Sequence, residues 1–307
     1  MENKIIKINK KYSYRNLKND LEYLKYEYLD NLVIGDIGES ILGEKIKFLK
    51  IGKGDKKIFI NASHHANEWM TSLIIMIFVE KYLNLIKNNQ NYKGFNIEEL
   101  FNKVSFYVVP MVNPDGVDFC VGERKISELE KYKELLEPYV NSLDSWKANI
   151  RGVDLNLNYP AGWEQAKINK AKIGVIKPNY RDYVGPNYLS EKETIAMYKF
   201  SMIHKFDLSI SLHSQGQEIY WNYQNIEVPR AKEIGKKFAK ASGYLLTEPV
   251  FNSSFAGYKD WFIKEFQKPA YTIEIGKGEE GKSLKLENAI KVYQEVEEIF
   301  FIAMEEI

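Results

Sequence analysis

The chain of 307 residues is poor in the features that mark several classes of protein. It has one cysteine, Cys120, so no internal disulfide bond can form, as is typical of proteins from reducing compartments. Its formal net charge is only +1, which gives no electrostatic reason to expect a nucleic acid or a membrane surface as partner. The longest apolar run, LIIMIFV at 73–79, is too short to cross a bilayer, and residues 1–20 lack a secretory signal pattern. We therefore expect a soluble cytoplasmic protein.

Common catalytic signatures are missing as well. The stretch GEKIKFLKIGKGDKK at 43–57 has neither the spacing of a phosphate-binding loop nor a helix after it. No HExxH zinc-protease motif is present, and Cys120 lacks the histidine and asparagine context of a cysteine nucleophile. These absences argue against a nucleotide-binding enzyme, an HExxH protease and a cysteine hydrolase.

The chain reads as one domain over residues 1–307, because no repeat and no Pro/Gly/Ser-rich linker divides it. Two turns are expected, a hairpin turn at GKGD (52–55) and a turn at NPDG (113–116) that ends a strand. The expected strands are 45–51, 57–62, 104–112, 208–214 and 270–276, and the expected helices are 16–28, 69–88, 190–206, 227–243 and 284–305. This alternation predicts an α/β fold with a mixed, mostly parallel central sheet and helices on both faces.

Chemically active side chains follow three of the expected strands. His65 and Glu68 come after the second strand, His213 closes the fourth, and Glu274 closes the fifth. Ligands bind at the carboxyl ends of strands in open sheets, so these side chains are expected to converge in one crevice. Each residue alone has an ordinary structural explanation, and His204, inside an expected helix, is interpreted as structural. Their joint occurrence in a chain with four histidines favours a metal site.

Two histidines and one glutamate form a known ligand set for catalytic zinc. His65 and Glu68 are three residues apart, so they share one face of a helical turn, whereas His64 points elsewhere. His213 would supply the third ligand. Glu274 would stay free of the metal, take a proton from water and return it to a leaving amine.

Six motifs resemble, in order along nearly the whole chain, those of the zinc carboxypeptidase family. They are HHANEW (64–69), PMVNPDGV (110–117), RGVDLNLNYPAGW (151–163), SLHSQGQ (211–217), YKDWF (258–262) and YTIEIG (271–276). The resemblance implies a single zinc peptidase domain with one Zn²⁺ on His65, Glu68 and His213, and Glu274 as general base and acid. It also implies that YKDWF is a loop at the floor of the specificity pocket.

The resemblance assigns roles to three further residues. Asp154 in GVDLN is expected to orient His65. Family members use an arginine after a tryptophan to stabilise the negative charge on the substrate oxygen. Here Lys147 stands at that place in WKANIRGVD, with Arg151 as the nearby alternative.

The departures from the family concern the substrate. True carboxypeptidases read Asn-Arg-Asn after GVD, and the Asn-Arg pair holds the free C-terminal carboxylate. Here Asn156 precedes Leu157, which cannot bind a carboxylate. Asn67 replaces the arginine that many members have in the zinc loop, and the position of the lid tyrosine, counted without gaps, falls on Asn252. Lys259 takes the place at the pocket floor, where a cation favours an acidic group.

One branch of the family, the γ-D-glutamyl–diamino acid peptidases, is similar in WKANxxGVDLN, PAGW and GYKDW. This resemblance implies a bacterial enzyme that hydrolyses γ-D-glutamyl–meso-diaminopimelate bonds in muropeptides, with Asn156 and Lys259 binding the substrate. One alternative is a carboxypeptidase for acidic C-terminal residues, with Arg181 as the carboxylate clamp. Another is an inactive zinc- or peptide-binding module, which the intact Glu274 disfavours. Nothing in the sequence indicates an oligomeric state.

Overall fold

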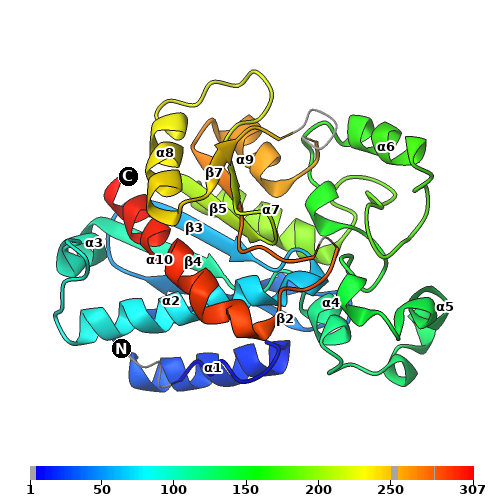
Figure 1. Ribbon diagram of the computed structural model, residues 1–307, viewed down its shortest axis with the longest axis horizontal. Coiled ribbons are helices and arrows are strands. Elements are labelled where there is room, and N and C mark those ends of the chain that lie inside the picture. The colour runs from blue at the N-terminus through cyan, green and yellow to red at the C-terminus, as the bar shows by residue number, and fades with distance from the viewer. Residues whose placement is uncertain (1–4, 250–254, 280) are drawn as a thin grey trace.

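The structure is a computed structural model that describes residues 5–249, 255–279 and 281–307 (Figure 1). Within these residues eight strands form one sheet in the order β1-β2-β4-β3-β5-β8-β6-β7. The strands are β1 (Leu32–Glu39), β2 (Lys45–Ile51), β3 (Lys56–Ala62), β4 (Val104–Val109), β5 (Leu208–His213), β6 (Glu218–Tyr220), β7 (Leu245–Thr247) and β8 (Ala270–Glu274). The central strands β4, β3, β5 and β8 are parallel, whereas β1, β2 and β6 add antiparallel pairings. The prediction of a mixed, mostly parallel sheet is confirmed.

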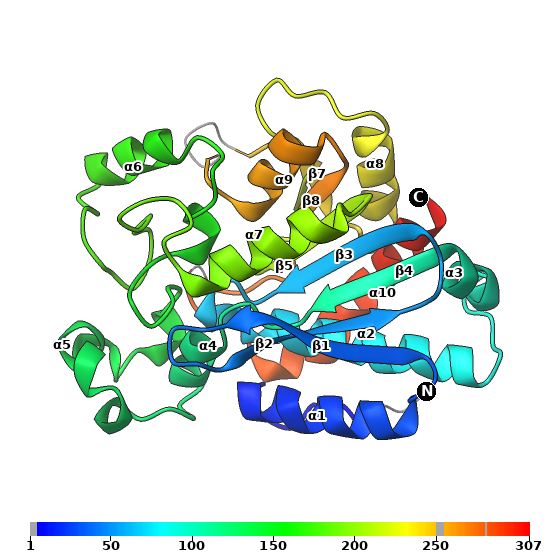
Figure 2. The ribbon, with the colours of Figure 1, turned by 180° about the vertical axis from the view of Figure 1, so that it is seen from behind.

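Helices cover both faces of the sheet (Figures 1 and 2). One face packs against α2 (Trp69–Lys87), α8 (Ala231–Ser242) and α10 (Ala289–Glu305), and the other against α7 (Lys192–His204) and α9 (Tyr258–Phe266). The remaining helices are α1 (Tyr14–Glu27), α3 (Ile97–Lys103), α4 (Pro114–Cys120), α5 (Lys133–Leu136) and α6 (Trp163–Lys172). The two main clusters of buried apolar side chains lie on opposite sides of the sheet, so the sheet separates two layers of core.

Helix α2 is apolar on nearly every side because it is enclosed on nearly every side. All residues from Trp69 to Glu80 are buried between the sheet and α10. The ring of Phe78 lies 4.7 Å from that of Phe300 and 4.9 Å from that of Phe301, between centroids. Burying each such ring contributes about 1.5–3 kcal/mol. The sequence predicted no apolar run long enough to span a membrane, but the segment Ala66–Lys87 reaches that length and hydropathy. Within the fold, 83% of the most apolar window of this segment is buried.

The expected hairpin at GKGD does not form. Strand β4 lies between β2 and β3, antiparallel to β2 and parallel to β3, so β2 and β3 do not pair. The glycines serve a close approach to the start of β4. A Cβ on Gly52 would lie 2.0 Å from the carbonyl oxygen of Val104, and one on Gly54 would lie 1.8 Å from that of Lys103. A composition that is typical of a hairpin turn therefore occurs here where two backbone segments approach each other closely.

The NPDG segment begins a helix instead of closing a turn. Asn113 accepts a hydrogen bond from the Gly116 amide at 3.1 Å, and Pro114 takes the first helical position of α4. The strand before it is shorter than expected and ends at Val109. The YKDWF segment, expected as a loop, is the first part of helix α9.

Candidate active site

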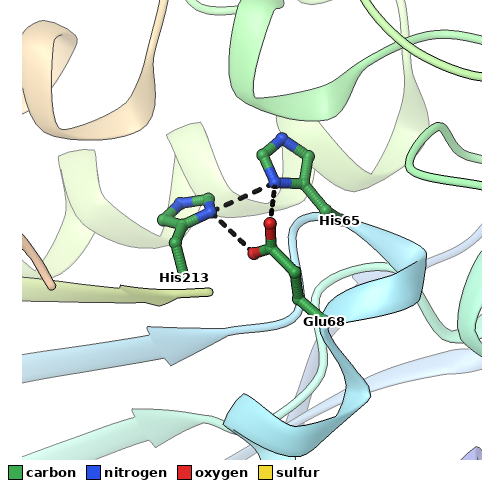
Figure 3. A group of neighbouring side chains, drawn as sticks. All are labelled: His65, Glu68 and His213. Atoms are coloured by element: carbon green, nitrogen blue, oxygen red, sulfur yellow. Dashed lines mark hydrogen bonds and ion pairs between the residues drawn. The ribbon is translucent and has the colours of Figure 1, made fainter. Parts of the chain in front are cut away.

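The carboxyl ends of β3 and β5 bring His65, Glu68 and His213 together (Figure 3). After β3 the chain forms a 3-10 turn at Ala66–Glu68, which runs directly into α2. Thr71 donates its hydroxyl to the Glu68 carbonyl at 2.7 Å and so fixes this turn. His213 is the last residue of the neighbouring strand β5. The prediction that these three side chains converge at one edge of the sheet agrees with the structure.

The three side chains have the geometry of a zinc site. The distances are 2.8 Å from His65 Nδ1 to Glu68 Oε1, 3.0 Å from His213 Nδ1 to Glu68 Oε2, and 3.2 Å between the two Nδ1 atoms. Ligands about 2.1 Å from a tetrahedral zinc ion lie about 3.4 Å apart, so small shifts would seat the metal. The residues present therefore fit the ion.

Asp154 holds His65 from the opposite side of the ring. His65 Nε2 lies 3.0 Å from Asp154 Oδ1, which places the proton on Nε2 and leaves the Nδ1 lone pair for a metal. Burial raises the pKa of Asp154, but the neighbouring His65 outweighs it, and the pKa falls well below its ordinary value. For His65, burial lowers the pKa and the Glu68 carboxylate raises it, and the resulting pKa is about 9. Zinc would thus displace a proton on binding.

Glu274 stands next to the metal ligands at the end of β8. It is paired in register with His213 on β5, and its carbonyl accepts the Gln217 amide at 2.8 Å. Burial raises the pKa of the Glu274 carboxyl, an effect that His213 opposes and the Glu68 charge reinforces. A carboxylate with a raised pKa at this place is suited to accept a proton from water.

Lys147, and not Arg151, reaches the site. Its ammonium lies 3.4 Å from Glu68 Oε1 and is largely enclosed. Burial lowers the pKa of Lys147, but the negative charges of Glu68 and the other carboxylates raise it above its ordinary value, so the cation is retained. The Arg151 Nε atom instead lies 3.7 Å from Oε2 of the buried Glu191, and the Arg151 side chain is 42% exposed.

Two cavities meet at Glu274 and Tyr220. The first has a volume of about 250 Å³ and the second about 610 Å³, and among the described lining residues these two are the only ones that both cavities share. The first is lined by Asn156, Leu157, Tyr220, Pro249, Phe255, Gly257, Lys259, Asp260, Thr272 and Glu274. The second is lined by Asn67, Lys147, Arg181, Ser214, Gln215, Gly216, Tyr220, Glu274, Lys277, Gly278, Gly281 and Lys282. Arg181 and Lys259, which the carboxypeptidase alternative places around one substrate residue, thus lie in different cavities.

Lys259 is not an isolated cation. Its ammonium lies 2.6 Å from Asp260 Oδ1 and also donates to the Asn222 carbonyl. Both side chains of this pair are only 6% exposed. The amide of Tyr258 donates to Asn156 Oδ1 at 3.0 Å, which fixes the start of α9 against the segment that follows Asp154. The floor of the first cavity therefore presents an ammonium and a carboxylate side by side.

His64 is not part of the ligand cluster, although its ring lies 5.8 Å from that of His213 between centroids. Its Nε2 lies 2.9 Å from the Tyr159 hydroxyl, and the side chain is completely buried. Asn252, the counterpart of the lid tyrosine, lies outside the described residues. No motif in the sequence points to Tyr220, which lies on the three-residue strand β6. Asp260 belongs to the YKDWF motif, but that motif does not by itself indicate a role for this residue in substrate binding.

The sequence model "Peptidase_M14: Zinc carboxypeptidase" matches residues 17–298. The chain is 36% identical to gamma-D-glutamyl-L-diamino acid endopeptidase 1 of Lysinibacillus sphaericus over 297 aligned residues. This alignment covers 95% of the chain and 72% of that protein. The chain is 38% identical to the uncharacterized protein YqgT of Bacillus subtilis, covering 80% of this chain and 65% of that one, just under two thirds. Among solved structures, the fold is similar to bovine thrombin-activatable fibrinolysis inhibitor in complex with tick carboxypeptidase inhibitor, with a TM-score of 0.75 between the two structures. The superposition covers 97% of this chain and 98% of that one, at 19% sequence identity. This structural likeness shows the same fold.

Proposed function

The chain belongs to the zinc carboxypeptidase family and is a zinc peptidase, and from this premise we propose that it hydrolyses the γ-D-glutamyl–meso-diaminopimelate bond of bacterial cell-wall peptides. The observation that supports this substrate is the ion pair of Lys259 and Asp260 at the floor of the first cavity. The name of the relative from Lysinibacillus sphaericus points to the same class of bond.

The ion pair matches the end of a diaminopimelate side chain, which bears an ammonium and a carboxylate on one carbon. Lys259 uses two of its three donors on Asp260 and Asn222, so one remains for a substrate carboxylate. Asp260 Oδ2 has no hydrogen bond to the described residues and can accept from the substrate ammonium. Both substrate charges would be paired, and neither charge of the pocket would be left alone.

The residues around Glu274 provide the remaining chemistry. His65, Glu68 and His213 would hold the zinc ion, which would supply a Lewis acid that acidifies water and polarises the scissile carbonyl. Glu274 takes a proton from the attacking water while the water oxygen bonds to the carbonyl carbon. Glu274 then delivers that proton to the leaving amine when the C–N bond breaks. Lys147 stabilises negative charge on the carbonyl oxygen. Asp154 keeps His65 in the orientation and tautomer that metal binding requires.

A carboxypeptidase for acidic C-terminal residues is less well supported. Its substrate would bring carboxylates into a cavity where Asp260 already neutralises Lys259. Leu157 lines that cavity, and Arg181 does not. An inactive binding module is disfavoured because Glu274 and Lys147 are both placed for catalysis.

The test is cleavage of synthetic L-Ala-γ-D-Glu-meso-diaminopimelate by the zinc-loaded protein. Release of L-Ala-D-Glu and free meso-diaminopimelate, followed by mass spectrometry, would support the proposal. Blocked dipeptides that end in Glu or Asp serve as competing substrates. If they are cleaved and the muropeptide is not, with zinc content verified, the substrate assignment is wrong.

A further inference from the structure

The second cavity, called the acyl-side cleft below, lies across Glu274 from the Lys259 pocket. If the diamino acid leaves from the first cavity, the γ-glutamyl part of the substrate occupies this cleft. Its lining is strongly cationic. The cations are Lys147, Arg181, Lys277 and Lys282, and the only carboxylate among the described lining residues is Glu274.

Two of these cations are not neutralised locally. Arg181 Nε bonds to Asp182 Oδ2 at 2.9 Å, but Lys170 takes the other oxygen of the same carboxylate at 2.6 Å. One negative charge is thus shared by two positive ones. Lys277 makes no ion pair with any part of the chain that the structure describes. Lys282, by contrast, is offset by Glu279 at 2.7 Å.

Arg181 and Lys277 both line the cleft. Arg181 Nη1 lies 3.7 Å from the position that a Cβ would take on Gly281, in the same loop as Lys277. The bond from Nε to Asp182 orients the guanidinium, and its terminal nitrogens make no hydrogen bond to the described residues. A planar fork held in this way is suited to a carboxylate, which it can bind through two parallel hydrogen bonds.

We infer that the acyl-side cleft binds the free α-carboxylate of a γ-linked glutamyl residue, with Arg181 and Lys277 as its partners. The inference rests on the proposed function. In a γ-linked glutamate the scissile carbonyl belongs to the side chain, so the α-carboxylate stays free on the acyl side. In an ordinary α-linked peptide that carboxyl is consumed in the scissile bond. The cleft would therefore favour the γ-linked glutamyl residue, through charge, over an α-linked residue without an acidic side chain, because such a residue supplies no anion there.

The experiment compares two substrates that share the scissile bond. One is L-Ala-γ-D-Glu-meso-diaminopimelate, and the other has the glutamyl α-carboxylate converted to a carboxamide. We expect wild-type kcat/KM to be about tenfold or more higher for the carboxylate, because hydrogen bonds to charged partners are the stronger ones. In Arg181→Gln and in Lys277→Gln this preference should fall toward one. Lys240→Gln, on the exposed side of α8, is the matched control and should keep it.

Two results would overturn the inference while leaving the proposed function in place. One is equal cleavage of both substrates by the wild type. The other is an equal loss on both substrates in Arg181→Gln and Lys277→Gln, with unchanged melting temperatures. Lys277→Gln guards against a folding defect, because Lys277 has no ion pair in the described chain to lose. Failure to cleave either substrate with zinc bound would refute the proposed function itself, and the inference with it.

Discussion

Replacing Asp154 with asparagine should weaken zinc binding without unfolding the protein. One oxygen of Asp154, Oδ1, contacts His65 Nε2 at 3.0 Å and accepts from the Asn156 amide at 3.2 Å. The other, Oδ2, accepts from the Asp182 amide at 3.3 Å. An asparagine can keep its oxygen on the first side only by turning its NH₂ group toward the Asp182 N–H. The reverse orientation gives up the bonds to His65 and to the Asn156 amide, so at least one donor is unsatisfied in either case.

The magnitude follows from these contacts. Losing a charged partner behind a metal-binding histidine costs about 10- to 100-fold in metal affinity. This corresponds to about 1.4–2.7 kcal/mol of binding free energy. The conflict at the Asp182 amide adds about 1–3 kcal/mol to the destabilisation of the fold. We therefore expect a folded Asp154→Asn protein with a lower melting temperature and a raised zinc dissociation constant.

Competition with a chromophoric chelator measures the zinc affinity, and a thermal melt in excess chelator measures the fold without metal. Glu274→Gln is the control, since it alters a carboxylate beside the metal without touching a ligand or Asp154. An Asp154→Asn affinity within twofold of the wild type would refute the role assigned to this contact. A complete loss of zinc, as expected for His65→Ala, would show that Asp154 is itself essential for the site.

Three further predictions test the site and the fold. His65→Ala should abolish stoichiometric zinc binding and His64→Ala should retain it, as measured by metal analysis after dialysis; the opposite pattern would contradict the ligand assignment. Glu274→Gln should lower kcat by about two orders of magnitude or more and keep one zinc per chain, so a variant with normal turnover would exclude Glu274 as the base. Burial raises the pKa of Glu193 to about 8 from an ordinary value of 4.5. The folded state therefore binds more protons than the unfolded state between these values, and the free energy of unfolding falls as pH rises from about 4.5 to 8, by up to about 5 kcal/mol. Glu193→Gln should flatten this slope in urea titrations at pH 5 and 8, and an unchanged slope would show that Glu193 is not its source.

The sequence was informative where local chemistry decides the structure. The apolar run of α2 and the glycine that ends α8, Gly243 with φ of 75°, could be recognised from residues close in the chain. The pairing of β2 with β4 could not, because it joins segments more than fifty residues apart. Strand β1 escaped prediction because its glycines and acidic residues, as in GDIGE, are poor strand formers.

At the site, the strand-end rule found the metal ligands and Glu274, because the carboxyl ends of parallel strands must meet. The same rule could not identify Asp260 as the partner of Lys259, because neither residue lies at the end of a strand. Consecutive residues on a helix do not face each other, so the sequence offered no reason to pair Lys259 with Asp260. In the structure the two side chains nevertheless make that contact within the first turn of α9.

The register between β5 and β8 has a consequence for redesign. His213 and Glu274 are directly paired across this parallel ladder, whose strands lie about 4.8 Å apart. The spacing between metal ligand and base is thus imposed by main-chain pairing deep in the sheet, while substrate selection is assigned to α9 and to the loop near Lys277. Reactivity and recognition are consequently separable modules. A library confined to residues 257–260 and 277–282 could exchange one substrate for another while the hydrolytic machinery stays in register.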